Sequence, residues 1–243
     1  MSMTEIIALP NGTLSTNSYF VPLADNSGTH GGKRGFLVDP ASSDIVPLLK
    51  KHNVEVLAVA LTHGHFDHIM GLGAVIDAYS PVDASGGRKT LPIGCHRLDK
   101  PLFGAAMTDA HRSVFLSWDI AALLPQVEAL PAATAALEDG DSLAALFPSG
   151  CAQDVSESLA KWRVLHTPGH TEGGICLLNA QEKLLISGDT LFSDTYGRTD
   201  LVGGDMRKMR DSLHRLFAID DATQIFPGHG TYGTTIKQAK TWM

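Results

Sequence analysis

Residues 62–68 read THGHFDH and follow directly on the apolar run VEVLAVAL. Three histidines and one aspartate therefore stand within a single turn at the end of an expected strand. In an extended segment, alternate residues point the same way, so His63 and His65 face one point. Asp67 and His68 lie past the bend and face another point. One loop thus offers donor pairs to two adjacent cations, and histidine and carboxylate donors without cysteine suit zinc, iron or manganese.

Three further loops carry the same kind of residue at the end of an expected strand. They are HTPGHT, ISGDT and FPGHG, which contribute His170, Asp189 and His229. Glycine stands beside each of these residues and lets the backbone turn sharply, so that distant loops can approach closely. One such residue alone is more often structural, but the joint occurrence of four such loops predicts a single shared metal site.

The composition argues against several classes of function. The chain has 243 residues, of which 44% are apolar, and a net charge of −7. That charge, without any basic tract, argues against a nucleic-acid partner. The N-terminus lacks a signal-peptide pattern and no apolar run could span a bilayer, so no membrane association is expected. The three cysteines are widely spaced without a CxxC pair, which favours the reducing cytoplasm over a disulfide framework or a thiolate zinc site.

Strand-type and helix-type patterns alternate along the chain. Short β-rich apolar runs predict strands at 5–9, 18–23, 35–38, 54–61, 162–165, 173–179, 183–187 and 223–226. Hairpin turns are expected at 25–33 and 137–143. Helical spacing predicts helices at 42–53, 69–79 and 205–217. Ser42 or Ser43 is the expected cap of the first helix, and the last carries one apolar stripe of Met206, Met209, Leu213 and Leu216.

This alternation predicts an α/β fold with helices covering sheets. We expect one domain over residues 1–243. The pattern weakens between 80 and 131, a stretch rich in Pro, Ala and Gly with a modest helical pattern at 119–127. We interpret that stretch as a helical and loop insertion. The sequence carries no signal for an oligomeric state.

The motifs together resemble the metallo-β-lactamase fold superfamily, and within it the short glyoxalase II-like (hydroxyacylglutathione hydrolase-like) branch. THGHFDH matches the signature loop, and TPGHT, SGDTLF and PGHG match the later ligand loops in order. GRTDLVGGD at 197–205 resembles the GRTD-type segment of that branch. The resemblance implies an αβ/βα sandwich of two mixed β-sheets flanked by helices, with two divalent metal ions at one edge.

The resemblance also implies a role for each candidate residue. The implied ligands of the first cation are His63, His65 and His170. Those of the second cation are Asp67, His68 and His229, with Asp189 shared between the two. Asp39 would support the histidine loop from behind. Arg198 lies two residues before Asp200 and is interpreted as its partner in an ion pair.

Two cations, zinc being the first choice, lower the pKa of a shared water so that a bridging hydroxide forms near neutral pH. Asp67 is the expected catalytic residue that aims this nucleophile. A thiolate leaves readily because a thiol pKa is about 8.5, whereas an amide nitrogen needs a proton donor that the motifs do not supply. This favours thioesters, and then activated esters, over amides, and the resemblance implies a small acyl-thiol substrate similar to S-lactoylglutathione.

Two other activities of the same fold remain open from the sequence. A persulfide dioxygenase would hold a single iron on His63, His170 and Asp189. A lactone or ester hydrolase would use the two-metal site on an oxygen ester. A non-enzymatic metal-binding module would have closed coordination, whereas seven candidate ligands for two cations leave room for water.

Overall fold

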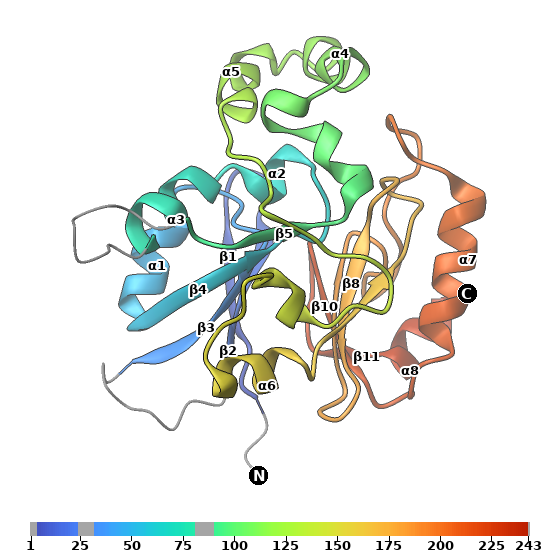
Figure 1. The fold of residues 1–243 in the computed structure, drawn as a ribbon. Coiled ribbons are helices and arrows are strands. Elements are labelled where there is room, and N and C mark those ends of the chain that lie inside the picture. The colour runs from blue at the N-terminus through green and yellow to red at the C-terminus, as the bar shows by residue number, and fades with distance from the viewer. Residues whose placement is uncertain (1–3, 24–31, 81–89, 243) are drawn as a thin grey trace, which may run out of the picture.

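Two β-sheets form the centre of the molecule in the computed structural model, which describes residues 4–23, 32–80 and 90–242 (Figure 1). Within these residues the first sheet has six strands, in the order β1 (Ile7–Asn11), β2 (Thr16–Pro22), β3 (Lys33–Val38), β4 (Val54–Ala60), β5 (Ile93–Cys95) and β6 (Ala135–Ala136). The second has five, in the order β11 (Thr234–Thr235), β10 (Gln224–Pro227), β9 (Leu184–Gly188), β8 (Ile175–Asn179) and β7 (Arg163–His166). Each sheet contains parallel and antiparallel pairs. The prediction of an αβ/βα sandwich of two mixed sheets is confirmed.

Side chains of the central strands alternate between two separate cores. In β2, Phe20 packs toward the helices outside the first sheet, whereas Tyr19 and Val21 pack toward the second sheet. In β3, Leu37 packs toward the helices and Phe36 packs toward the second sheet. Because neighbouring residues of a strand point to opposite faces, a strand covered on both sides is apolar at nearly every position. This explains the continuous apolar run of β4.

Helices cover the outer face of each sheet (Figure 1). The first sheet is covered by α1 (Ile45–Lys51) and α3 (Leu72–Tyr79), and the second by α7 (Met206–Phe217) and α8 (Ile236–Ala239). The other helical segments are α2 (Phe66–Ile69), α4 (Asp109–Ser117), α5 (Leu124–Glu128), α6 (Gln153–Leu159), η1 (Arg97–Leu102), η2 (Gly104–Ala106), η3 (Ala121–Leu123), η4 (Leu143–Leu146) and η5 (Lys240–Trp242). No helix among the described residues is long and apolar enough to cross a bilayer.

The expected helix at 205–217 forms as α7, with one difference. The Asp205 carboxylate accepts hydrogen bonds from the backbone N–H groups of Arg207 and Lys208 and so caps the helix. The buried stripe consists of Met209, Leu213 and Leu216. Met206 was expected on this stripe but is exposed at the first residue of the helix.

The expected serine cap of α1 was wrong. The N-cap residue is Asp44, and its side chain makes no capping hydrogen bond. The Ser42 hydroxyl instead accepts a hydrogen bond from the Asp44 backbone N–H, which closes a turn just before the helix starts.

The stretch from 80 to 131 holds α4, α5 and several short 3-10 turns, of which α4 and α5 lie above one edge of the sandwich (Figure 1). It differs from a pure helical and loop insertion because β5 pairs with β4 in the first sheet. The hairpin expected at 137–143 was wrong, since these residues lead from β6 into η4. Most of the other expected hairpin turn, residues 25–31, lies outside the described residues, and β2 and β3 on either side of it pair antiparallel.

Candidate metal centre

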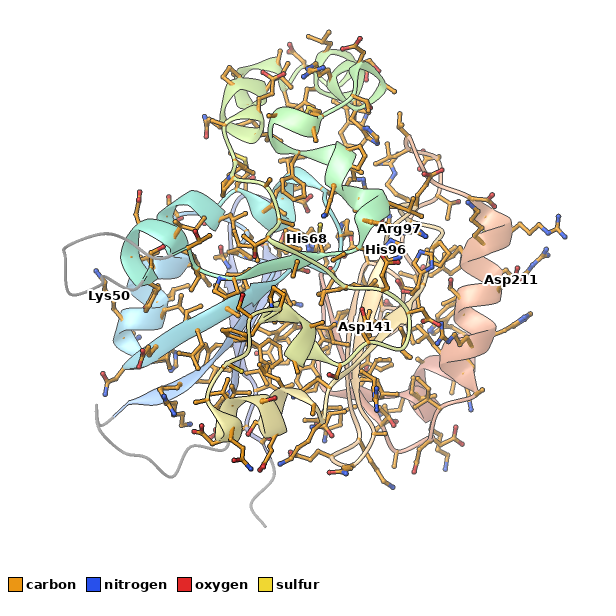
Figure 2. The ribbon with its side chains drawn as sticks, in the orientation of Figure 1. Lys50, His68, His96, Arg97, Asp141 and Asp211 are labelled. Carbon is orange, nitrogen blue, oxygen red and sulfur yellow. The ribbon has the colours of Figure 1, made fainter. Side chains whose placement is uncertain are left out.

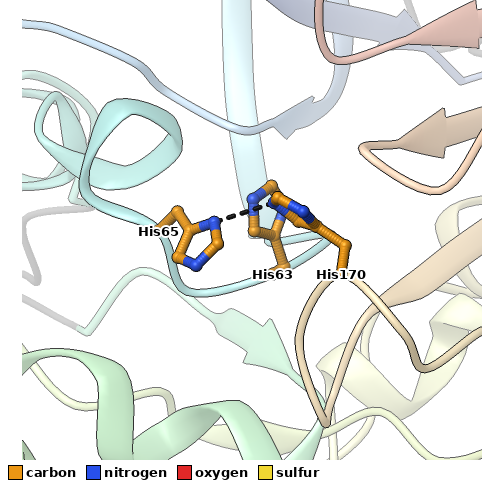
Figure 3. Close-up of side chains that lie close together, drawn as sticks. All are labelled: His63, His65 and His170. Atoms are coloured by element: carbon orange, nitrogen blue, oxygen red, sulfur yellow. Dashed lines mark hydrogen bonds between the residues drawn. The ribbon is translucent and has the colours of Figure 1, made fainter. Parts of the chain in front are cut away.

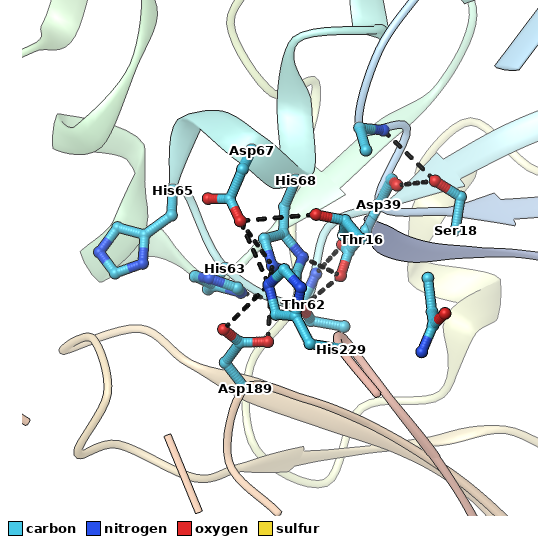
Figure 4. A network of polar contacts seen from close by, with 12 residues as sticks. Thr16, Ser18, Asp39, Thr62, His63, His65, Asp67, His68, Asp189 and His229 are labelled. Atoms are coloured by element: carbon cyan, nitrogen blue, oxygen red, sulfur yellow. Dashed lines mark hydrogen bonds and ion pairs between the residues drawn. The ribbon is translucent and has the colours of Figure 1, made fainter. Parts of the chain in front are cut away.

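The seven predicted ligand side chains converge at the edge of the sandwich where β4, β7, β9 and β10 end. Six of them belong to two groups of three, in each of which the donor atoms lie within 4.8 Å of one another, and a third group of this kind, Asp39, His63 and His68, overlaps both. The first group, shown in Figure 3, is His63, His65 and His170. The second group is Asp67, His68 and His229, shown with its surroundings in Figure 4. These two groups contain the same residues as the two ligand sets that the resemblance implied.

Asp189 lies between the two groups. One carboxylate oxygen is 3.5 Å from Nε2 of His170, and the other is 3.5 Å from Nε2 of His68. A single side chain at the end of β9 thus reaches both sets of donors. This is the position that a carboxylate shared by two cations would occupy.

Backbone and side-chain acceptors fix the orientation of the imidazole rings. In three of the rings, Nδ1 lies within hydrogen-bond distance of an acceptor oxygen, and Nε2 is directed into the cluster. The acceptors are the Asp39 carboxylate at 2.9 Å, the Arg198 carbonyl at 2.8 Å and the Leu14 carbonyl at 3.2 Å, for His68, His170 and His229 respectively. Histidines that bind metals are generally held in this way, with the distal nitrogen bonded to a second group.

Asp39 supports the first loop from behind, as the resemblance implied. Its carboxylate accepts hydrogen bonds from the backbone N–H and the hydroxyl of Thr62, at 2.7 and 2.5 Å. The Thr62 hydroxyl in turn lies 3.1 Å from Nδ1 of His63. Asp39 is buried and has a positive φ of 50°, a conformation that aspartate tolerates better than most residues. One carboxylate therefore orients both His63 and His68.

Two buried polar atoms at the centre of the cluster have no hydrogen-bond partner among the described residues. They are Nε2 of His63 and Oδ1 of Asp189. A buried polar atom without a partner costs about 1–3 kcal/mol, so such atoms in a folded protein require an explanation. A divalent cation satisfies both, and the histidine and carboxylate donors around it have the chemistry that such cations accept.

The charges of the cluster also suit cations. Burial lowers the pKa of His63, His65 and His170, which keeps these rings neutral as metal ligands must be. Burial alone would raise the pKa of Asp67, but the neighbouring His68 and His229 hold it well below its usual range. The first group therefore presents neutral imidazoles, and the second presents the ionised Asp67 carboxylate.

Metal binding is expected to release a proton from His68. Burial alone would lower the pKa of this ring, but Asp189, Asp67 and Asp39 together raise it to about 10. Its Nε2 is thus protonated at neutral pH in the metal-free protein, and a cation must displace that proton. The affinity for Zn²⁺, used as a probe, should rise about tenfold per pH unit between roughly pH 6.5 and 8.5.

Isothermal titration calorimetry in two buffers of different ionisation enthalpy measures that proton release directly. At least about one proton per chain is expected near pH 7.5. A Zn²⁺ affinity that does not change with pH would contradict this description of His68.

A glycine allows the last ligand loop to approach the others. A β-carbon on Gly228 would collide with the Asp189 carboxylate and lie 2.6 Å from the His68 ring. Only hydrogen fits at this position, which places His229, the next residue, beside Asp67 with 3.2 Å between Nε2 and Oδ2.

Asp99 is a positioning residue that the sequence did not indicate. Its buried carboxylate accepts hydrogen bonds from the Gly64 N–H at 3.0 Å, the Thr171 hydroxyl at 2.8 Å and the Gly173 N–H at 2.6 Å. It therefore ties the loop of His63 and His65 to the loop of His170. Burial outweighs these donors and raises the pKa of Asp99 to about 6, so the group is ionised at neutral pH. In the sequence Asp99 stands near Arg97 and Lys100, and such a mixture of charges is typical of a solvent-exposed segment.

Replacing Asp99 with asparagine is expected to loosen the first donor group. The amide offers one acceptor oxygen and opposes an N–H donor with its own NH₂, so at least one buried donor loses its partner. The free energy of unfolding should fall by about 1–3 kcal/mol. Metal affinity should fall about 10- to 100-fold, as for other groups that orient ligands.

Chemical denaturation and competition with a chelator measure the two effects. Asp211→Asn is the matched control, because Asp211 is exposed on the outer side of α7 (Figure 2). If Asp99→Asn matched this control in both measurements, Asp99 would have no positioning role.

Comparison with known proteins identifies relatives along nearly the whole chain. A family model described as the metallo-beta-lactamase superfamily matches residues 11–229. The uncharacterized protein ML0493 of Mycobacterium leprae is 33% identical over 241 residues, which cover 95% of this chain and 93% of that protein. Hydroxyacylglutathione hydrolase GloC of Haemophilus influenzae is 26% identical over 215 residues, covering 86% of this chain and 85% of that one.

Comparison with solved structures also identifies proteins that are similar along nearly the whole chain. The protein TTHA1623 in a di-iron-bound form is 27% identical, with a TM-score of 0.71 and 97% of both chains covered. ETHE1 from Myxococcus xanthus is 22% identical, with a TM-score of 0.64 over 98% of this chain and 82% of that one, and shows the shared fold. With its two-sheet sandwich and its clustered histidine and aspartate donors, the chain belongs to the metallo-beta-lactamase superfamily.

Proposed function

We propose that this protein is a metal-dependent hydrolase of acyl thioesters. The observation that carries the proposal is the convergence of two three-residue donor groups on either side of Asp189, at the floor of a cavity. The similarity to a protein named hydroxyacylglutathione hydrolase supports a thioester as the substrate class. The reaction adds water to the thioester carbonyl and releases a carboxylic acid and a thiol.

The proposed ligands are the two donor groups, with Asp189 shared between them, and the proposed metal is zinc. Histidine and carboxylate donors without cysteine suit zinc, and iron and manganese accept the same set. When bound, two such cations supply an acidified water and an electrophile for the carbonyl oxygen. The protein holds these donors rigidly through Asp39, Asp99 and the backbone carbonyls behind the rings.

Asp67 is the proposed catalytic residue. Its carboxylate lines the cavity, and Oδ2 lies 3.2 Å from Nε2 of His229 and 3.5 Å from the Thr16 hydroxyl. An ionised carboxylate in this position accepts a hydrogen bond from the attacking water and aims its lone pair at the carbonyl carbon. The low pKa of Asp67 keeps it in this acceptor form throughout the neutral range.

The leaving group favours a thioester over an amide. A thiolate departs without a proton because a thiol pKa is about 8.5, whereas an amine leaving group has to be protonated. The Asp67 carboxylate, which lines the cavity, cannot be that proton donor because the neighbouring His68 and His229 hold its pKa well below its usual range. Oxygen esters and lactones are expected to react less readily than thioesters and more readily than amides, since their alkoxide leaving groups are more basic than thiolates.

A persulfide dioxygenase is the competing activity, because His63, His170 and Asp189 also lie together. Such an enzyme would use a single iron on these three residues and leave the second group without a metal. The similarity to a di-iron-bound protein and the compact second group of Asp67, His68 and His229 favour two cations over one.

A substrate panel separates the activities. The purified protein is assayed with S-lactoylglutathione, a simple acyl thioester, a lactone, an anilide and glutathione persulfide, by thiol release, acid release and oxygen uptake. We expect thioester turnover that exceeds lactone and anilide turnover by at least about tenfold. Oxygen uptake with sulfite formation, and no thiol release, would overturn the proposal in favour of a dioxygenase.

A further inference from the structure

A cavity of about 200 Å³ lies over the donor cluster, and its two ends differ in chemistry. The floor consists of ligand side chains, among them His65, Asp67, His170 and Asp189. The wall is apolar and consists mainly of Leu102, Val114, Phe115, Trp118, Leu201 and Val202. A substrate whose carbonyl lies on the floor therefore extends an attached group along an apolar wall.

The wall is part of a packed structure that α4 brings over the site. The Phe115 ring packs against Phe66, with 5.7 Å between ring centroids, next to the metal loop. The Arg112 guanidinium bonds Glu128 at 2.6 Å, which joins α4 to α5. Residues 102–118, part of the segment that had no assigned role from the sequence, thus build one side of the cavity.

Positive charge in the described lining of the cavity is already engaged. The Arg198 guanidinium bonds both oxygens of Asp200 at 2.7 Å, as the sequence predicted, and lies 4.9 Å from the centroid of the Trp118 ring. Burial lowers the pKa of His111, so this ring is neutral at pH 7. An anionic group on the wall side would have to compete with Asp200 for the Arg198 guanidinium.

The volume decides which half of a thioester the cavity takes. Pockets that enclose drug-sized ligands hold about 300–1,000 Å³, so this cavity is too small for a peptide-sized thiol together with an acyl group. A short acyl group fits, and the thiol half then extends through the open side of the cavity to solvent.

We infer that the wall formed by Leu102, Val114, Phe115, Trp118, Leu201 and Val202 binds the acyl half of the substrate and selects short apolar acyl groups over hydroxylated or anionic ones. The inference rests on the proposed thioester hydrolysis and specifies its substrate class. Burial of a methylene group contributes about 0.8 kcal/mol, which is roughly a fourfold change in kcat/KM.

The test is a series of thioesters of one small neutral thiol, N-acetylcysteamine, carrying acetyl, butanoyl, hexanoyl, lactoyl and succinyl groups. We expect kcat/KM to rise at least about tenfold from acetyl to butanoyl and to stay high for hexanoyl. For the lactoyl and succinyl thioesters, kcat/KM should be at least about tenfold lower than for the butanoyl thioester, because their polar groups lose bound water when they contact the apolar wall.

Substitutions of wall residues test whether the wall causes the selectivity. Val114→Asn should lower kcat/KM for the hexanoyl thioester at least about tenfold more than for the acetyl thioester. The matched control is Leu116→Asn on the same helix, since Leu116 is 64% exposed and does not line the cavity. Val202→Asn, in a loop at 36% exposure, repeats the test if Val114→Asn lowers the melting temperature.

The outcomes separate the two proposals. Turnover that is equal across the series, or highest with the lactoyl or succinyl thioester, would overturn the acyl selectivity and leave the hydrolase proposal standing. A Val114→Asn variant that keeps the full chain-length gradient would also overturn the assignment to the wall. The absence of turnover with every thioester would overturn the hydrolase proposal itself, and the selectivity with it.

Discussion

Replacing Asp189 with alanine should lower thioester kcat/KM by about 10³-fold or more and remove at least one of the two bound cations. The reason is geometric, because the two oxygens of Asp189 lie 3.5 Å from the ring nitrogens of His170 and His68. Loss of one electrostatic group at other hydrolytic centres costs about 10²–10³ in rate, and loss of a shared ligand also removes the second cation.

Metal analysis of the purified variant, together with kcat/KM for the best thioester, measures both effects. Asp194→Ala is the matched control, because this carboxylate lies on the same loop and is exposed. We expect the control to keep its metal content and its activity. An Asp189→Ala protein with two cations and more than about a tenth of the activity would contradict the shared position of Asp189.

Asp67 is expected to have the second-largest effect, with a different kinetic signature. Asp67→Ala should lower kcat by about 10²–10³-fold with little change in KM, because the carboxylate acts on the attacking water and not on the acyl or thiol group. Asp67→Asn keeps an acceptor oxygen and should retain more of the activity.

Steady-state kinetics of both variants, with their metal content, separates an aiming role from a ligand role. If Asp67→Ala loses one cation and the activity returns with excess Zn²⁺, Asp67 acts mainly as a ligand. Unchanged turnover in Asp67→Ala with full metal content would remove Asp67 from the reaction.

The seven-residue loop at 62–68 was enough to predict the site because its chemistry is local. Alternation in an extended segment sets the direction of His63 and His65, and the bend sets that of Asp67 and His68. The later loops followed from the same pattern of strand, glycine and donor. The meeting of the ends of β4, β7, β9 and β10, which belong to two different sheets, at one edge could not be read from spacing alone, and the family resemblance supplied it.

The residues that sequence reasoning missed are those whose role depends on tertiary packing. Asp99 stands between two basic residues, a pattern typical of solvated surface, and only the fold buries it between two loops. The apolar wall near Trp118 was missed although Val114, Phe115 and Trp118 have the spacing of one face of α4, because the face is short and the surrounding segment has a weak pattern. The hairpin expected at 137–143 failed because its turn residues lead into η4 instead of a second strand.

Titration of the metal-free protein with Zn²⁺, with thioester hydrolysis followed after each addition, tests the central claim most directly. The claim is that two cations held by the His63, His65 and His170 group and by the Asp67, His68 and His229 group, with Asp189 between them, carry out the hydrolysis. We predict no turnover without metal and an activity that reaches its maximum at about two equivalents per chain. Full activity at one equivalent, or turnover in the metal-free protein, would contradict it.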